Sequence, residues 1–159
     1  MSTSWSRSVI EDTLDIHGEM LFLSEVDHTN RTSEESFEVF ESSAKFDASF
    51  FAFRDHLSQG TTDMGPLPGV FLMECMAQTA AFGLSVTFDK ATFLVTHFNV
   101  ALSKKVGPGI VKSVCKVPKI WPSLAAKIKV SVTSWQENSI VGRGDLTYSR
   151  AENLVRIDQ

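Results

Sequence analysis

The segment from Leu67 to Phe88 constrains this chain more than any other, because it joins a helix start to a long apolar run. Pro68 and Gly69 open it, and proline suits a first helical turn since the N–H that it lacks would be unpaired there anyway. The run predicts a buried helix from Pro68 to about Val86. Polar residues, prolines and a glycine interrupt it, so it lacks the ~20 consecutive apolar residues of a membrane span.

Glu74 is the charged residue inside this run. Ionisable groups seldom lie in apolar surroundings unless they are paired or used chemically. Burial disfavours the charged form, which predicts a raised pKa for Glu74 and lets it hold a proton near neutral pH, as a general acid must. The alternative is a carboxylate at a helix or subunit contact, neutralised by a Lys or Arg from elsewhere. The helix alone leaves both interpretations open.

The composition predicts one domain over residues 1–159, with its core at about 16–150, since 43% of the 159 residues are hydrophobic and 21% are charged. No signal peptide or membrane span is visible, which predicts a cytoplasmic location. Cys75 and Cys115 have no metal-ligand spacing, and Cys75 is expected to be a buried thiol. The basic residues of the second half match no nucleic-acid motif and the net charge is −4, so nucleic-acid binding is not expected.

Apolar and polar residues alternate on both sides of the predicted helix, which is typical of strands. Residues 8–16 could form a short helix or an extended lead-in, and the first strands are predicted at Met20–Val26 and Phe37–Phe46. Four more are predicted after the helix, at Thr92–Ser103, Gly109–Trp121, Ser123–Trp135 and Ser139–Ser149. Strands, one long helix and then a meander of strands predict an α+β fold, with an antiparallel sheet curled around a central helix.

Four segments, in this order, resemble the 3-hydroxyacyl-acyl-carrier-protein dehydratases of the hot-dog fold. They are the opening His and first strand in Ile16–Leu23, the aromatic segment that leads to the catalytic His in Phe50–His56, the central-helix signature in Leu67–Gln78, and the strand and turn after the helix in Phe98–Gly109. The resemblance covers about residues 16–150. It implies the hot-dog fold, an antiparallel sheet wrapped around a long central helix.

The resemblance also implies catalytic roles for His56 and Glu74. His56 would remove the α-proton of a 3-hydroxyacyl thioester, Glu74 would help to protonate the departing hydroxyl, and a trans-2-enoyl thioester would result. The backbone N–H of Gly69 would bind the thioester oxygen, and Gln78 would orient Glu74 or a water. The chain departs from the family at this point: Asp55 replaces the Gly that normally precedes the His, and the loop that follows is about four residues longer.

Further implied features concern the substrate and the partners. An apolar tunnel would hold the acyl chain, and the candidate residues for its lining are Phe22, Phe53, Phe71, Met73 and Phe93. Lys104 and Lys105 would face the phosphopantetheine or an acidic acyl carrier protein. No metal or cofactor is implied beyond the phosphopantetheine that carries the substrate. The family forms its site between two protomers, so a homodimer or a larger oligomer is expected, in fatty-acid, polyketide or polyene biosynthesis.

Two other functions are compatible with the same residues. The first is an acyl-thioester hydrolase on the same fold, in which a helix-borne carboxylate activates water without His56. The second is a non-catalytic acyl-binding subunit. The other histidines have weaker claims: His17 is expected to serve packing or hydrogen bonding near the first strand, His28 to lie in a polar turn, and His97 to be a sheet residue.

Overall fold

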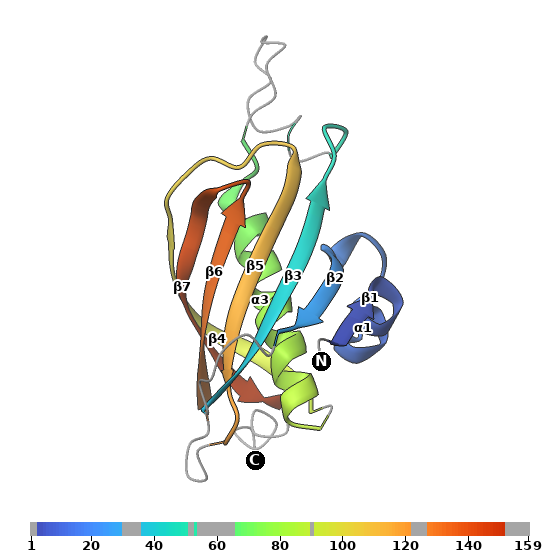
Figure 1. Cartoon of the computed structure of the whole chain (residues 1–159), viewed down its shortest axis with the longest axis vertical. Coiled ribbons are helices and arrows are strands. Elements are labelled where there is room, and N and C mark those ends of the chain that lie inside the picture. The colour runs from blue at the N-terminus through green and yellow to red at the C-terminus, as the bar shows by residue number, and fades with distance from the viewer. Residues whose placement is uncertain are drawn as a thin grey trace, which may run out of the picture.

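A seven-stranded antiparallel sheet curls around one long helix, α3 (Gly69–Thr87) (Figure 1). The computed structural model describes residues 3–29, 36–50, 53, 66–89, 91–121 and 127–151. The strand order is β1-β2-β3-β5-β6-β7-β4. The other elements are β1 (Thr3–Ser6), α1 (Arg7–Leu14), the 3-10 helix η1 (Gly18–Met20), β2 (Leu23–His28), β3 (Phe37–Phe46), β4 (Phe93–Leu102), β5 (Gly109–Pro118), β6 (Lys127–Gln136) and β7 (Ser139–Arg150).

The predicted architecture is confirmed: the sheet is antiparallel and α3 contacts strands β2 to β7. The helix begins at Gly69 with Pro68 as its N-cap, as the Pro–Gly pair predicts, and the strand predicted at Phe37–Phe46 has those bounds. The lead-in is the short helix α1. The predicted start of the first strand at Met20 was wrong, because β2 begins at Leu23. Gly18 has a φ of +66° and begins a 3-10 turn that occupies residues Gly18–Met20.

Strand β1 was not predicted from the sequence. Its residues alternate weakly and lie mostly on the surface. The strand forms because it pairs with β2, with Trp5 opposite Val26, and because the Trp5 ring packs 5.3 Å from the Phe82 ring and 6.1 Å from the Phe40 ring. Those partners are distant in sequence, so only the tertiary fold reveals the strand.

The core lies between α3 and the concave face of the sheet. Gly83 allows a close approach, because a Cβ at this position would lie 2.7 Å from Cδ2 of Phe40. Among the described helices α3 alone has the length and apolar character of a membrane span, and 61% of that span is buried in the fold. Burial against the sheet therefore accounts for its apolar sequence, and α3 is the core helix of this fold.

Candidate functional site

Glu74 lies on α3 and is held by the amide of Gln78, one turn further along the helix. Nε2 of Gln78 donates to Oε1 of Glu74 at 3.1 Å and to the carbonyl oxygen of Met20 at 2.7 Å. Oε1 of Gln78 accepts a hydrogen bond from the Phe22 backbone N–H at 3.0 Å. The buried Gln78 side chain thus ties Glu74 to the chain between η1 and β2. The contact between Gln78 and Glu74 is present, and the orienting role of Gln78 in a reaction stays a prediction.

The surroundings of Glu74 differ from the expected fully apolar environment. Its side chain is half-buried in the single chain, between buried residues on either side of α3. Within the described ranges no Lys or Arg pairs with it, so the alternative of a neutralising cation within the chain finds no support there. The Glu74 residue is partly exposed in the single chain, and an amide donor holds its carboxylate.

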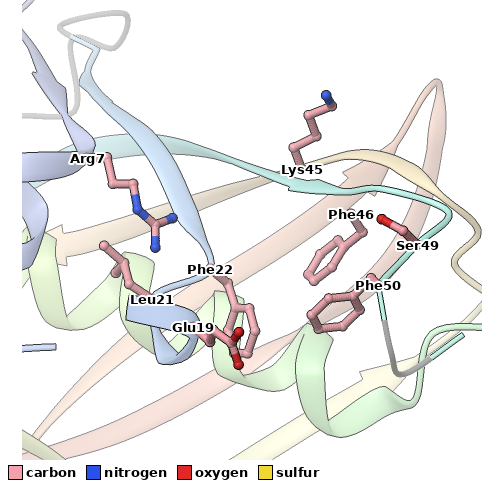
Figure 2. A pocket seen from close by; sticks show the side chains of 8 residues that line it. All are labelled: Arg7, Glu19, Leu21, Phe22, Lys45, Phe46, Ser49 and Phe50. Carbon is pink, nitrogen blue, oxygen red and sulfur yellow. The ribbon is translucent and has the colours of Figure 1, made fainter. Parts of the chain in front are cut away.

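A pocket of about 380 Å³ lies next to this face of the helix, between α1, η1 and the end of β3 (Figure 2). Its lining residues combine rings with polar groups: Arg7, Glu19, Leu21, Phe22, Lys45, Phe46, Ser49 and Phe50. Phe71 of α3 supports it from below, since its ring lies 5.6 Å from Phe22 and 5.3 Å from Phe50 in edge-on contacts. Phe71 and Gln78 are two turns apart, so the pocket and the Glu74 carboxylate belong to one face of α3.

A second pocket, of about 320 Å³, lies at the first turn of α3. Pro66, Leu67, Gly69, Leu72, Leu102, Ser103, Lys104, Lys105 and Val106 line it. The structure therefore brings together three residues that the sequence analysis selected separately, Gly69, Lys104 and Lys105. Gly69 is at the helix N-terminus, where backbone N–H groups are unpaired and the helix dipole favours negative charge.

The two pockets lie on different sides of α3. Gly69 and Leu72 face Leu102 and the β4–β7 side, whereas Glu74 and Gln78 face η1 and β2. Five residues along a helix correspond to about 7.5 Å of rise between Gly69 and Glu74. Gly69 and Glu74 of one chain therefore do not face the same pocket.

The predicted acyl-tunnel residues divide into three groups. Phe22 lines the first pocket, and Phe71 and Phe53 support it, with the buried Phe53 ring 6.2 Å from Phe50. Met73 is half-buried and lines neither pocket. Phe93 lies in another cluster, 6.2 Å from Phe88 and 5.7 Å from Trp121.

The pocket residues that the sequence analysis did not select include Arg7, Phe46 and Leu102. Phe46 carried a signal, because it shares the inward parity of Phe40 along β3. The sequence around Arg7 and Leu102 has no pattern that indicates a place in a pocket. Their places depend on how α1 and β4 pack, which periodicity does not reveal.

His56 lies outside the described residues, so its proposed role stays a prediction. The described histidines lie away from Glu74. Nε2 of His17 is 3.4 Å from Oδ1 of Asp15 on the surface, and His97 is exposed on β4. The prediction that His28 lies in a turn is wrong, because His28 is the last residue of β2. Its Nε2 atom lies 2.5 Å from Oε2 of Glu38.

Both cysteines are buried in the core, as predicted for Cys75. Burial raises the pKa of the Cys75 thiol far above its usual range, and the negative charge of Glu74 raises it further. Burial also raises the pKa of Cys115 to about 12. These thiols stay protonated at neutral pH, which makes them core groups rather than nucleophiles.

The sheet order and the central helix define a hot-dog fold, which solved structures share with this chain. No protein-family model and no curated protein sequence matches the chain. A fluoroacetyl-CoA thioesterase variant bound to fluoroacetate has a TM-score of 0.59 at 12% identity, over 77% of this chain and 94% of that one. A thioesterase of Haemophilus influenzae has a TM-score of 0.54 at 15% identity, over 78% and 76%.

A phenylacetic acid degradation-related protein of Ralstonia eutropha has a TM-score of 0.55 at 16% identity, over 70% of this chain and 75% of that one. Identities this low establish the fold and leave the reaction open. The hot-dog part of the predicted resemblance is confirmed. The dehydratase part stays a prediction, because the solved structures named here include thioesterases.

Proposed function

We propose that this chain hydrolyses acyl thioesters to a carboxylic acid and a thiol, with Glu74 as the general base. The observation that carries the proposal is the placement of Glu74: a half-buried carboxylate, held by Gln78, beside an aromatic pocket. The named activities of two structural neighbours, both thioesterases, support the same reaction class. Hydrolysis needs one helix-borne carboxylate and a water, so it does not depend on His56.

The proposed reaction proceeds in two steps. Glu74 takes a proton from a water molecule, whose oxygen forms a bond to the thioester carbonyl carbon, and the carbonyl oxygen becomes an oxyanion. In a homodimer the Gly69 N–H of the second protomer would stabilise that oxyanion, because Gly69 and Glu74 of one chain face different sides of α3. Preorganised donors of this kind are often the largest catalytic contribution. The intermediate then collapses, the carbon–sulfur bond breaks, and the proton held by Glu74 goes to the departing thiolate.

The second pocket is the proposed binding site for the thiol portion of the substrate. Lys104 and Lys105 line it together with Gly69, and their positive charges complement the phosphate of a phosphopantetheine group. Nζ of Lys104 donates to Oγ of Ser139 at 3.0 Å and retains further donors. Coenzyme A and an acidic acyl carrier protein both carry this group, so both remain proposed carriers. No metal or further cofactor enters the proposal.

A homodimer belongs to the same proposal. β4 is an edge strand of ten residues, paired with β7 on one side. Its side chains Leu94 and Leu102 are 48% and 44% exposed. Natural proteins cover or interrupt long edges of this kind, and a second copy would cover this one. The mass in solution, measured by light scattering, tests the dimer.

Dehydration of 3-hydroxyacyl thioesters is the second candidate function. The observation in its favour is the sequence motif itself, a histidine before the Pro–Gly helix start together with Glu74. His56 would take the α-proton, the carbon–carbon double bond would form, and the 3-hydroxyl would leave as water with a proton from Glu74. This reaction requires the imidazole to reach the same acyl group as the carboxylate.

One assay separates the two functions. The protein is incubated with a 3-hydroxyacyl-CoA and with the matching unsubstituted acyl-CoA, and both free thiol and enoyl product are followed. Hydrolysis predicts thiol release from both substrates, loss of activity in Glu74→Gln, and retained activity in His56→Ala. Enoyl formation that is lost in both variants would overturn the hydrolase proposal in favour of dehydration.

A further inference from the structure

We propose that the 380 Å³ pocket between α1, η1 and β3, hereafter the aromatic pocket, receives the acyl end of the substrate and selects a flat aryl group without negative charge. The inference deepens the proposed function and rests on it. Four observations carry it: the volume of the pocket, the arrangement of its rings, the charges on its wall, and its position on the same face of α3 as Glu74.

The volume suits a ring with a short linker. An apolar cavity of about 150 Å³ holds one benzene molecule. The aromatic pocket offers about 380 Å³ in the single chain, so a phenyl ring and a few linking atoms fit. Its base is closed by buried Leu21 and by the inward-facing Phe46 (Figure 2).

The rings of the pocket are arranged edge to face. The planes of Phe22 and Phe50 meet at 90° with centroids 6.2 Å apart, and those of Phe46 and Phe50 at 61° with centroids 5.3 Å apart. A further ring that enters the pocket can pack edge to face against its lining rings Phe22 and Phe46. Aromatic pairs of this geometry gain attraction beyond the apolar area that they bury. An aryl ligand gains from this effect, and a saturated ring of similar size does not.

The charges on the wall disfavour an anionic acyl group. The guanidinium of Arg7 points into the pocket and already has hydrogen-bond partners. It donates to the carbonyl oxygen of Gly18 at 2.7 Å and to the carboxylate of Glu11 at 3.3 Å. The ammonium of Lys45 points away and pairs with Asp47 at 3.1 Å. The carboxylate of Glu19, also on the wall, has no ion-pair partner among the described residues. An acyl group with a terminal carboxylate therefore meets repulsion without a free cation.

The pocket lies on the same face of α3 as the proposed base, and Glu74 and Gln78 are not among its lining residues. Its wall residue Phe22 donates its backbone N–H to Gln78, and the same Gln78 amide donates to Glu74. The Phe71 ring of α3 packs against Phe22 and Phe50, two rings of the pocket. An acyl group seated against these rings thus lies on the face of α3 that carries the catalytic carboxylate.

The test compares three CoA thioesters: 3-phenylpropanoyl, 3-cyclohexylpropanoyl and adipoyl. We expect kcat/KM to be about 2- to 10-fold higher for the phenyl than for the cyclohexyl substrate, and the adipoyl substrate to be the poorest. Phe50→Leu keeps an apolar wall but removes one ring, and should bring the phenyl to cyclohexyl ratio close to one. Phe88→Leu, in the separate cluster with Phe93, is the matched control and should keep the wild-type ratio.

Binding provides a readout that does not depend on turnover. Calorimetric titration with 3-phenylpropanoate should show binding to the wild type and its loss in Ser49→Trp, because Ser49 is an exposed wall residue whose enlargement fills the pocket without disturbing the core. Binding without cleavage of any thioester would uphold the aryl site and overturn the hydrolase proposal. Equal kcat/KM for all three thioesters, or binding unchanged in Ser49→Trp, would overturn the aryl site and leave the hydrolase proposal intact.

Discussion

Replacing Gln78 by methionine removes the amide that positions Glu74 while keeping a side chain of similar length. Three hydrogen bonds are lost, to the Phe22 N–H, to the Met20 carbonyl and to Glu74. A buried polar group left unpaired costs about 1–3 kcal/mol. The Phe22 N–H bears this cost, whereas Met20 is 64% exposed and its carbonyl can bind water. We therefore expect Gln78→Met to lower the free energy of unfolding by about 1–3 kcal/mol, which corresponds to a fall of about 2–12 °C in Tm.

The effect on turnover should exceed the effect on the fold. A displacement of ~1 Å at a reacting group can cost ~100-fold in rate. Without its donor, Glu74 is free to change rotamer, so we expect kcat in Gln78→Met to fall about 10- to 100-fold. Acyl-CoA hydrolysis under saturating substrate measures kcat, and urea denaturation followed by circular dichroism measures the free energy of unfolding.

Gln136 offers a matched control for this experiment. Its amide also bonds two backbone groups, accepting from the Gly107 N–H at 3.0 Å and donating to the Gly107 carbonyl at 2.8 Å. It lies at the end of β6, and it lines neither of the two pockets of the candidate site. Gln136→Met should lose comparable stability and keep kcat. If the two variants show the same kcat, the positioning role of Gln78 is refuted.

The charged variant Gln78→Glu adds a pH dependence whose sign follows from the geometry. Two carboxylates at about 3 Å share one proton, so the folded pKa of the pair lies above the ~4.3 of a glutamate in the unfolded chain. A raised folded pKa gives stability that is present below the unfolded pKa and is lost as pH rises through the folded pKa. Urea midpoints of this variant should fall relative to the wild type between pH 4 and 8. Parallel pH profiles for the two proteins would contradict the close contact.

Three further predictions address the fold and the second pocket. Gly144→Ala should destabilise the chain by about 3 kcal/mol in urea denaturation, because its Cβ would lie only 2.1 Å from the backbone oxygen of Asn99 on β4. Above pH 9 the unfolded chain loses the protons of both thiols and the folded chain keeps them. Between about pH 9 and 10, below the range in which the buried Tyr148 also contributes, the free energy of unfolding should therefore fall by about 3 kcal/mol per pH unit, and Cys115→Ala should halve that slope. In Gly69→Ala the new Cβ would lie 2.3 Å from Cδ1 of Leu102, whose flexible side chain is 44% exposed and can move away. The free energy of unfolding should therefore change by less than about 1 kcal/mol, while KM for acyl-CoA rises. A second substitution, Leu102→Ala, should restore KM.

Much of the fold could be predicted because its signals are local. A Pro–Gly start and a 19-residue apolar run determine α3, and alternating side chains determine β3 and the four strands after the helix. The same local signals selected Glu74 and Gln78, since residues four apart share a helix face. The proximity of Gly69 to Lys104 and Lys105 also agrees with the sequence interpretation.

Other features depend on contacts between residues far apart in the chain. Gln78 reaches Phe22 and Met20 across 56 and 58 residues, and Arg7 becomes a pocket wall only because α1 packs beside η1. The sequence by itself determined the long helix, β3, the four strands after the helix and the carboxylate on that helix, because period and turn chemistry act over a few residues. Only the tertiary structure decided that this carboxylate lies beside an aromatic pocket, because that neighbourhood is set by how α1, η1 and β3 pack against one face of α3.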